Sequence, residues 1–400
     1  MLNIGPIFNA MLRNKSSVIL MVLQVALTLA IVSNAAYIIN ERLELMQRDT
    51  GLDESQLFSF NIFTFAKDIE ISQQLELDED MLRAIPGVNN AVAINQVPLT
   101  GAGDSSGFRT QINTDGAKVV QAGIFKADEH LLKTLGLTVI EGRDFTQEDV
   151  VSGSDAAQPN AVIITKAMAD ELFPDGNALG KDIYQFDKPI RIIGVVKHMQ
   201  GSWLSSTIVN KSLFSPVISP NTFKRFLINA DKAAMTTIMS TIAERMLALN
   251  KGRVIMEPNK LEDHLRDQYQ ADNLMVNMLI IIISIILFIT ALGVAGMAIF
   301  NVNRRKRQIG TRRALGASQS NILSHFMIEN LLMTVIGIVI GVVLTVFLNG
   351  YLMEYFSSSR IASSYIITTI IGLVLLGQLA VLFPAKSAAA ISPAIATRSV

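Results

Sequence analysis

The chain of 400 residues contains no cysteine, and this absence removes several classes of function. Without thiols there can be no disulfide bond, no thiolate metal site and no cysteine nucleophile. The sequence also lacks a Walker A motif, the glycine-rich loop with a lysine that holds nucleotide phosphates. We therefore expect that this chain does not hydrolyse ATP by itself.

Histidine is scarce as well. The four histidines stand at positions 130, 198, 264 and 325, with none of the spacings that metal ligands adopt, so packing or solvated roles are favoured over metal binding. No pairing of a nucleophile with a base is visible either. The sequence predicts no catalytic residue, no metal site and no cofactor in this chain, and an enzyme is its weakest interpretation.

Charge is missing at the middle of four long apolar runs, at residues 17–39, 273–300, 326–349 and 365–384. Each run is long enough to cross a bilayer as a helix, which takes about 20 residues. Ion-coupled transporters usually carry a titratable or coordinating group at mid-depth. We therefore predict four transmembrane helices. We expect the energy for the protein's function to come from outside these helices.

A basic segment at residues 304–317 separates the second run from the third and contains six lysines and arginines. Such a segment stays in the cytoplasm, because lysine and arginine next to a span resist translocation. Both termini are then cytoplasmic, and residues 40–272 lie on the other side. The segment could be only an orientation anchor or also a docking surface, and physical reasoning alone leaves both open.

The first run has an alternative interpretation. Arg13 and Lys15 precede it, and Ser33-Asn34-Ala35 has the small residues of a signal-peptide cleavage site. We favour a span, because the apolar run continues to Ile39. Residues 1–16 read as a short interfacial helix that leads into this span.

Residues 40–272 form an acidic region with an α/β pattern, and its charge argues against nucleic acid as a partner. Strand-like runs at 57–65 and 88–97 flank a helix expected at 78–85, and the far end repeats this order with a helix at 232–249. Two β-α-β ends predict one porter-like subdomain made from residues 40–100 and 204–272. A second subdomain, residues 101–203, is inserted between them.

Two glycine patterns have competing interpretations. The glycine-rich stretch at 101–107 has no lysine and no strand-loop-helix context, so we predict a flexible loop rather than a phosphate cradle. Gly337 and Gly341, four residues apart in the third span, allow a close approach of helices. Packing within the chain and a seam between two chains remain equally open for this pair.

The basic segment and its surroundings resemble a known family. Gln308-Ile309-Gly310-Thr311-Arg312-Arg313-Ala314-Leu315-Gly316-Ala317, then 326–332, Gly337 and a tail with Pro384, Pro393 and Arg398, are similar to the FtsX-like permease module of MacB-type ABC transporters. In the outer domain, Gly142-Arg143-Asp144-Phe145, Glu171-Leu172-Phe173-Pro174, Leu179-Gly180-Lys181 and 193–197 resemble the periplasmic core domain of that family.

The resemblance implies an α-helical membrane protein with four transmembrane helices and a large periplasmic α/β domain, porter-like with an inserted β-rich part. Residues 350–364 would be a short periplasmic loop, 301–325 a cytoplasmic coupling segment and 385–400 a cytoplasmic tail, in a bacterial inner membrane. It implies ATPase-coupling residues, namely Arg304, Arg305, Arg307, Gln308, Gly310, Arg312, Arg313, Ala314, Gly316, Ala317 and Glu329. The family commonly has glutamate at the position of Gln308, so this segment is more basic than usual.

The resemblance further implies partners and a mechanism. These are a dimer of a separate ABC ATPase that holds ATP and Mg²⁺, a second permease subunit in a homodimer or heterodimer, and a periplasmic adaptor with an outer-membrane channel. ATP-driven motion would pass to the periplasmic domain, a mechanotransmission mechanism, for efflux of periplasmic substrates. The alternatives are lipoprotein extraction, as in the Lol permeases, and regulation of a cell-wall hydrolase, as in FtsX proper, without transport.

Overall fold

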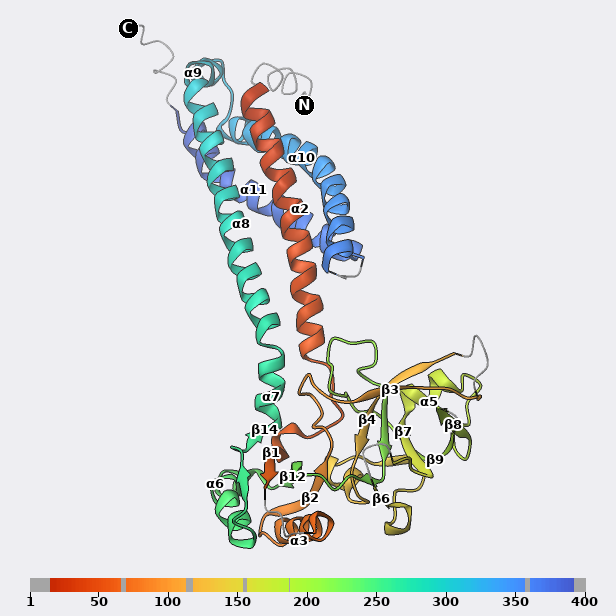
Figure 1. Cartoon of the computed structure of the whole chain (residues 1–400). Coiled ribbons are helices and arrows are strands. Elements are labelled where there is room, and N and C mark those ends of the chain that lie inside the picture. Colours follow the sequence, from red (N-terminus) through yellow and green to blue (C-terminus); the bar gives the residue numbers. More distant parts are fainter. Residues whose placement is uncertain are drawn as a thin grey trace. The chain divides into compact units, whose positions relative to one another are not determined.

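The computed structural model describes residues 15–65, 70–112, 118–153, 157–186, 188–356 and 360–391. Residues 1–14 of the expected interfacial helix and 392–400 of the expected tail lie outside the described residues. The chain forms two compact units, one from the residues up to Gln47 and from Ala271 onward, the other from Arg48–Gln270. Figure 1 labels their elements, and each unit is described by itself.

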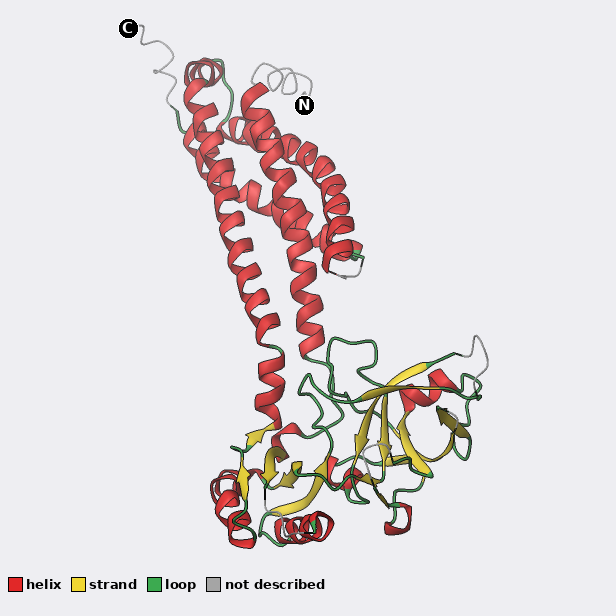
Figure 2. Cartoon of the chain, in the orientation of Figure 1, coloured by secondary structure: helices red, strands yellow, loops and turns green. Residues whose placement is uncertain are grey.

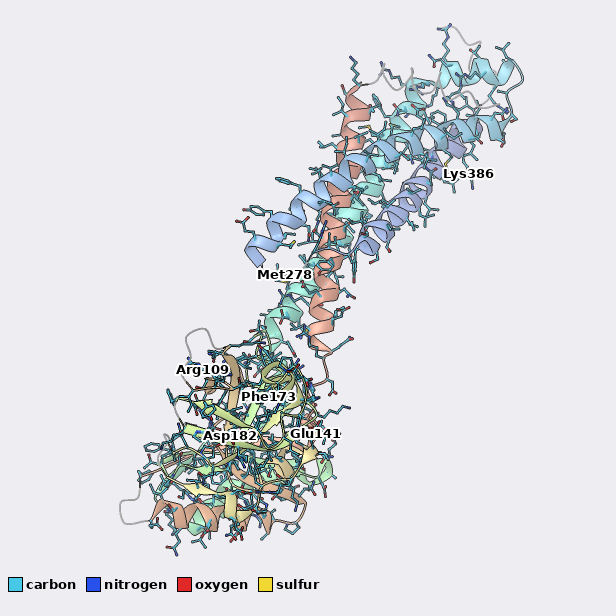
Figure 3. The ribbon with its side chains drawn as sticks, turned by 90° about the vertical axis from the view of Figure 1, so that its right-hand side faces the viewer. Arg109, Glu141, Phe173, Asp182, Met278 and Lys386 are labelled. Atoms are coloured by element: carbon cyan, nitrogen blue, oxygen red, sulfur yellow. The ribbon has the colours of Figure 1, made fainter. Side chains whose placement is uncertain are left out.

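The first unit contains the four apolar helices that the sequence predicts. They are α2 (Lys15–Met46), α8 (Gln270–Arg304), α10 (Gln319–Phe356) and α11 (Ser363–Ala389). All four are long and apolar enough to cross a membrane, with mean hydropathy from 2.2 in α2 to 3.0 in α8. Each helix extends beyond the apolar run that predicted it, because polar residues continue the turns at the ends. Apolar side chains such as Met278, 61% exposed on α8, suit contact with lipid (Figure 3).

The two glycines of the third span bring α10 directly onto α2. A Cβ atom on Gly337 would lie 2.8 Å from the Cβ of Val25, and one on Gly341 would lie 2.9 Å from Cδ2 of Leu29. Only glycine permits this spacing of the two helix backbones. The structure therefore supports packing within the chain for the Gly337 and Gly341 pair, one of the two uses that the sequence left open.

Polar side chains in the spans form hydrogen bonds between helices. The hydroxyls of Thr28 on α2 and Thr290 on α8 are 2.8 Å apart, and the Nε2 of Gln24 donates to the carbonyl oxygen of Ile289 at 3.1 Å. Asn34 donates from Nδ2 to the carbonyl oxygen of Thr345 on α10 at 3.2 Å. These residues thus hold the bundle together, because a polar group in hydrocarbon is costly unless it is paired.

The second unit contains two larger sheets (Figure 2). The first sheet is antiparallel, in the order β13-β1-β12-β2 with β14 also beside β1. Its strands are β1 (Leu57–Thr64), β2 (Val88–Ile94), β12 (Phe223–Ala230), β13 (Arg253–Ile255) and β14 (Asn259–Lys260). Helices α3 (Ile71–Arg83) and α6 (Lys232–Leu249) pack on one face. On the other face of the sheet, Nε2 of His264 in α7 (Leu261–Gln268) lies 3.4 Å from the Ser59 hydroxyl oxygen.

Apolar side chains alternate along the strands, and this alternation explains which face of the sheet packs against α3 and α6. Phe58, Phe60 and Ile62 stand at every second position of β1, so all three project to the side of α3 and α6. The rings of Phe60 and Phe226 stack with centroids 5.4 Å apart across the β1–β12 pair. The first sheet therefore contains β1 and β2 from the start of the unit and β12, β13 and β14 from its end.

The second sheet has seven strands in the order β3-β4-β10-β7-β9-β5, with β8 beside β9. They are β3 (Ser105–Phe108), β4 (Val120–Lys126), β5 (Val139–Gly142), β7 (Ala161–Thr165), β8 (Asp182–Gln185), β9 (Lys188–Val196) and β10 (Ser212–Ser215). Other short elements are α4 (Leu131–Leu135), α5 (Lys166–Leu172), η2 (Gln147–Asp149) and the paired strands β6 (Val151–Ser152) and β11 (Val217–Ile218). The sheet is mixed, since β4–β10 and β7–β9 are parallel.

Two boundaries differ from the sequence prediction. The inserted part does not end at residue 203, because β10 pairs with both β4 and β7 inside the second sheet. The helix expected at 78–85 begins seven residues earlier, at Ile71, and ends at Arg83. β10 was missed because two of its buried residues, Ser212 and Ser215, are polar. The first seven residues of α3 were missed because only one of them, Leu75, is buried.

Candidate functional site

The predicted coupling segment contains a helix of its own, α9 (Lys306–Ala314), between the end of α8 and the start of α10. The chain leaves this helix through Gly316, whose φ is +95°. The amide of Gly316 donates to the carbonyl of Arg313 at 3.2 Å, and the amide of Ala317 donates to that of Arg312 at 3.0 Å. This is a Schellman ending, which needs glycine for its left-handed residue.

One face of α9 is fixed in the helical bundle. Ile309 and Gly310 are buried, and Ile309 belongs to an apolar cluster with Ile322 and Phe326 of α10. Ala385 and Ala388 of α11 are in the same cluster. Burial of the isoleucine side chain stabilises this placement by about 1.5–3 kcal/mol. The position of α9 is therefore set by packing and not only by its connections.

An ion pair next to α9 strengthens this anchoring. Nη1 of Arg305 lies 2.9 Å from Oε2 of Glu329, and the two side chains are only 15% and 5% exposed. Removing one member of such a pair leaves a buried charge without its counterion and costs about 3–5 kcal/mol. Glu329 thus acts inside the bundle, as the counterion of Arg305, and is not accessible to a partner.

The opposite face of α9 is exposed and basic. It consists of Arg307, Gln308, Thr311, Arg312 and Leu315, which we call the α9 exposed face. These positions recur at the spacing that places residues on one side of a helix. Leu315 is 83% exposed, an unusual setting for a large apolar side chain. The face therefore combines two guanidinium groups, an amide and a hydroxyl with one apolar contact.

The structure divides the predicted coupling residues into three groups. Exposed are Arg304, Arg307, Gln308, Arg312, Ala314 and Gly316; partly buried are Arg305, Arg313 and Ala317; buried are Gly310 and Glu329. Arg313 donates from Nη1 to the carbonyl oxygen of Ala317 at 3.2 Å and so helps to close the turn after α9. Thr311 and Leu315 were not among the predicted residues, although the helical spacing from Arg307 would have indicated both.

The periplasmic motifs have structural roles. Arg143 makes two hydrogen bonds to Asp149, from Nη1 to Oδ2 at 2.6 Å and from Nη2 to Oδ1 at 2.9 Å. The side-chain hydrogen bond from Arg143 holds the pKa of the Asp149 carboxyl well below its usual value. Glu171 binds Nζ of Lys211 at 2.8 Å, and Lys181 lies 4.6 Å from the centroid of the Phe173 ring. These residues brace turns around the second sheet, where Figure 3 labels Phe173 and Asp182.

Among the described residues, no group of three or more histidine, aspartate or glutamate side chains is placed to hold a metal ion. His264 stands beside Ser59, and burial lowers the pKa of its imidazole. His198 pairs through Nε2 with the carbonyl oxygen of Asp49 at 2.7 Å. These two histidines have structural partners in the periplasmic unit.

Comparison with protein families identifies the chain's relatives. Residues 280–393 match the family described as FtsX-like permease C-terminal, and residues 18–245 match the MacB-like periplasmic core domain. The chain is 29% identical over 247 residues to the macrolide export ATP-binding/permease protein MacB of Neisseria gonorrhoeae (strain ATCC 700825 / FA 1090), which covers 60% of this chain and 36% of the relative. MacB of Bartonella henselae is 29% identical over 282 residues, 67% of this chain and 39% of the relative. The chain thus spans less than two fifths of the length of these relatives.

Among solved structures, the chain is similar to the periplasmic region of MacB from Actinobacillus actinomycetemcomitans, with a TM-score of 0.34 and 17% identity over 55% of this chain and 95% of that one. It is also similar to the extracellular domain of the noncanonic ABC-type transporter YknZ from Gram-positive bacteria, with a TM-score of 0.32 and 18% identity over 50% of this chain and 99% of that one. The two family matches together take in both units. The chain therefore belongs to the MacB-like and FtsX-like family of ABC transporter permeases, inner-membrane proteins with a periplasmic domain.

Proposed function

We propose that this chain is a permease subunit that passes the ATP-driven motion of a separate ABC ATPase to its own periplasmic domain. The arrangement of α9 is the main support for this proposal. One face of the helix is fixed by Ile309 and the Arg305–Glu329 pair, and the other offers Arg307 and Arg312 to a partner. A helix held in this way would move together with the bundle when a partner pushes on it.

The proposed partner is a dimer of ABC ATPase subunits that holds ATP and Mg²⁺, so this chain would not be an enzyme by itself. Guanidinium groups suit carboxylate and amide oxygens on such a partner, because they form paired, charge-assisted hydrogen bonds. Leu315 would add an apolar contact next to them. A second permease subunit would bind the second ATPase.

The transported material is proposed from the relatives. Their name is macrolide export ATP-binding/permease protein, which supports efflux of periplasmic substrates for this chain too. A periplasmic adaptor and an outer-membrane channel would complete the path to the outside. The spans themselves carry hydrogen-bonded polar groups between α2, α8 and α10, which suits a bundle that transmits motion.

Substitution of the α9 exposed face tests the proposal. The ATPase recovered with the unmodified chain from its native membrane is identified, purified separately and titrated against each variant. Arg307→Gln combined with Arg312→Gln should weaken ATPase binding at least about tenfold and lower permease-stimulated ATP hydrolysis, since a hydrogen bond to a charged group contributes about 1.5–3 kcal/mol. Membrane orientation should be kept, because four basic residues remain in the segment.

Lys386→Gln is the matched control. Lys386 is exposed in the last turn of α11, and its loss removes a positive charge outside the α9 exposed face (Figure 3). This variant should bind the ATPase as the unmodified chain does. If the double variant also binds normally, the arginines of α9 serve only to orient the spans, and the ATPase docks elsewhere.

A further inference from the structure

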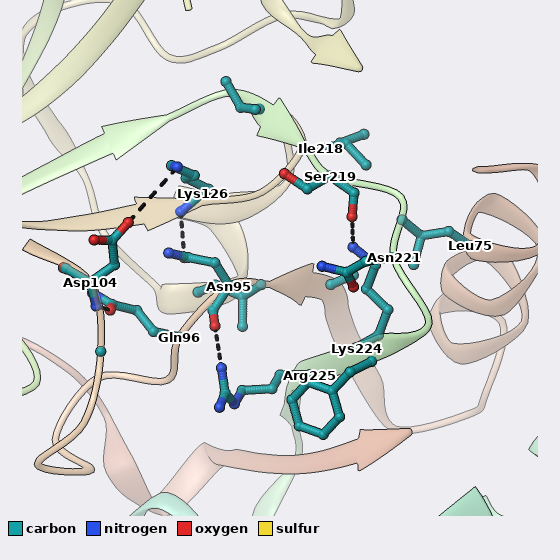
Figure 4. A pocket seen from close by; sticks show the side chains of 15 residues that line it. Leu75, Asn95, Gln96, Asp104, Lys126, Ile218, Ser219, Asn221, Lys224 and Arg225 are labelled. Atoms are coloured by element: carbon teal, nitrogen blue, oxygen red, sulfur yellow. Dashed lines mark hydrogen bonds and ion pairs between the residues drawn. The ribbon is translucent and has the colours of Figure 1, made fainter. Parts of the chain in front are cut away.

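A cavity of about 450 Å³ lies between the first and second sheets of the periplasmic unit. Its walls come from α3, from the end of β2 and the residues that follow it, from β4, and from the segment that runs from β11 into β12 (Figure 4). Ligand sites in proteins commonly have volumes of about 300–1,000 Å³. The cavity is therefore large enough for a small organic molecule.

The polar side of the cavity is cationic. Its lining contains three basic side chains, Lys126, Lys224 and Arg225, and one acidic side chain, Asp104. Positive groups therefore outnumber negative ones. Lys126 Nζ lies 3.8 Å from Oδ2 of Asp104. An anion that enters such a low-dielectric recess meets a favourable potential.

Arg225 is the best-placed of these cations. Its Nη1 donates to the main-chain carbonyl oxygen of Asn95, and its guanidinium lies 5.1 Å from the centroid of the Phe223 ring (Figure 4). A carbonyl and an aromatic face fix the side chain in place without neutralising its charge. Further donor positions on the guanidinium suit a carboxylate or phosphate group.

Part of the cavity wall is apolar. Leu75 of α3, Ala93 of β2, Val217 and Ile218 of β11, and Phe223 of β12 line it. A free inorganic anion would leave these side chains in contact with water. A molecule with an aliphatic body would cover them, and each buried CH₂ group contributes about 0.8 kcal/mol.

Two smaller hollows adjoin the cavity and share its lining. One, of about 200 Å³, includes Gln96, Gly103 and Arg225 together with Ser59 and His264. The other, of about 210 Å³, shares Asp104 and Lys126. The glycine-rich stretch that the sequence predicts to be a flexible loop therefore contributes to these walls, through Gly103 in the cavity and the first hollow and through Asp104 in the cavity and the second hollow.

We propose that this cavity binds a small amphipathic anion, with its carboxylate or phosphate head group on Arg225, Lys224 and Lys126 and its aliphatic body against Leu75, Val217, Ile218 and Phe223. The site lies in the periplasmic domain, apart from the proposed ATPase contact at α9. Its occupant would touch both sheets at once. The proposal stands whether or not α9 binds an ATPase.

The absence of cysteine provides the assay. Asn221→Cys places a single thiol at the cavity, and the full chain in zwitterionic lipid nanodiscs is treated with a charged maleimide at increasing concentrations of a probe. Octanoate and octyl phosphate should slow the labelling. Inorganic phosphate and octanol, which each lack one half of the proposed ligand, should slow it far less. Whichever of the two anions protects at lower concentration identifies the preferred head group.

Three controls make the result decisive. A thiol introduced by Ser240→Cys, exposed on α6 and outside the lining, should not be protected by any probe. In the Asn221→Cys chain, Lys224→Gln should raise the half-protecting concentration about tenfold. Lys188→Gln, exposed and also outside the lining, should leave this concentration unchanged.

The outcomes separate cleanly. If octanol protects the thiol as well as octanoate does, the proposal is overturned, because binding would then depend only on the aliphatic part of the probe. Failure of both anions to protect the thiol at position 221, or equal protection with and without Lys224, would overturn it as well. Arg225 donates to the carbonyl oxygen of Asn95 at the end of β2, whereas Lys224 donates to that of Ser219, outside the β2–β12 pair. Lys224 is therefore the variant that tests the charge without disturbing this pair.

Discussion

Arg253 and Asp78 form an ion pair with Nη1 and Oδ2 2.6 Å apart, and their side chains are 0% and 6% exposed. Burial raises the pKa of the Asp78 carboxyl, although the hydrogen bond from Arg253 opposes this effect. A pair of this kind contributes little net stability but is costly to break. It therefore fixes the placement of α3 against β13 more than it strengthens the domain.

Glu79, the next residue, gives a pH dependence. Burial, and after it the nearby Asp128, raises the pKa of the Glu79 carboxyl from 4.5 to about 8. The carboxyl is then protonated in the fold at neutral pH but ionised in the unfolded chain. The stability from this group is fully present below pH 4.5 and is lost as the pH rises towards 8, with a slope of at most about 1.4 kcal/mol per pH unit.

We therefore predict that the melting temperature of the periplasmic unit falls as the pH is raised from 6 to 8.5, and that Glu79→Gln flattens this fall. Circular dichroism of the full chain during heating would measure it. Glu76→Gln, an exposed position on the same helix, should leave the slope as it is. A slope that is identical in all three proteins would show that Glu79 is not the titrating group.

At the level of elements, the contact between α2 and α10 depends on two glycines. A methyl group at position 337 would lie 2.8 Å from the Cβ of Val25, an atom that cannot rotate away, so the two helices would have to separate. We predict that Gly337→Ala lowers the melting temperature of the membrane unit by several degrees. Thermal unfolding of the purified chain in a mild detergent is the measurement.

Gly350→Ala in the same helix serves as the comparison, since nothing lies within 4 Å of the added methyl group. This variant should melt at the original temperature or slightly above it. Equal melting temperatures for Gly337→Ala and the unmodified chain would mean that α2 and α10 are not packed as closely as described.

The elements differ in how far the sequence could predict them. The helix at 232–249 has the same bounds in the prediction and in the structure, because its apolar residues recur at helical spacing. β10 was missed because it has four residues, two of them buried serines, and so shows no alternation. In the candidate site, Gly316 after a basic turn indicates a helix end, whereas the Arg305–Glu329 pair joins residues 24 positions apart and depends on tertiary packing.

At the scale of the whole molecule, the arrangement across the membrane can be tested with single thiols. Ser105→Cys lies in the periplasmic domain and Ser318→Cys follows α9, and both positions are exposed. An impermeant maleimide added to spheroplasts should label the thiol at position 105 and not the one at position 318, because the basic segment stays inside. Labelling of both should follow only after the membrane is permeabilised. A labelled Ser318→Cys chain in intact spheroplasts would contradict the predicted orientation.

The strand order of the first sheet has a consequence for how the periplasmic unit is made. β12 lies between β1 and β2, so neither of these early strands has this neighbour until residues 223–230 have crossed the membrane. All strands of the second sheet lie between residues 105 and 215, so its pairings can form earlier during export. Throughout that interval β1 and β2 present unpaired edges, the state in which strands associate with the wrong neighbours. The inserted sheet can thus be complete before the sheet whose sequence it interrupts is able to close.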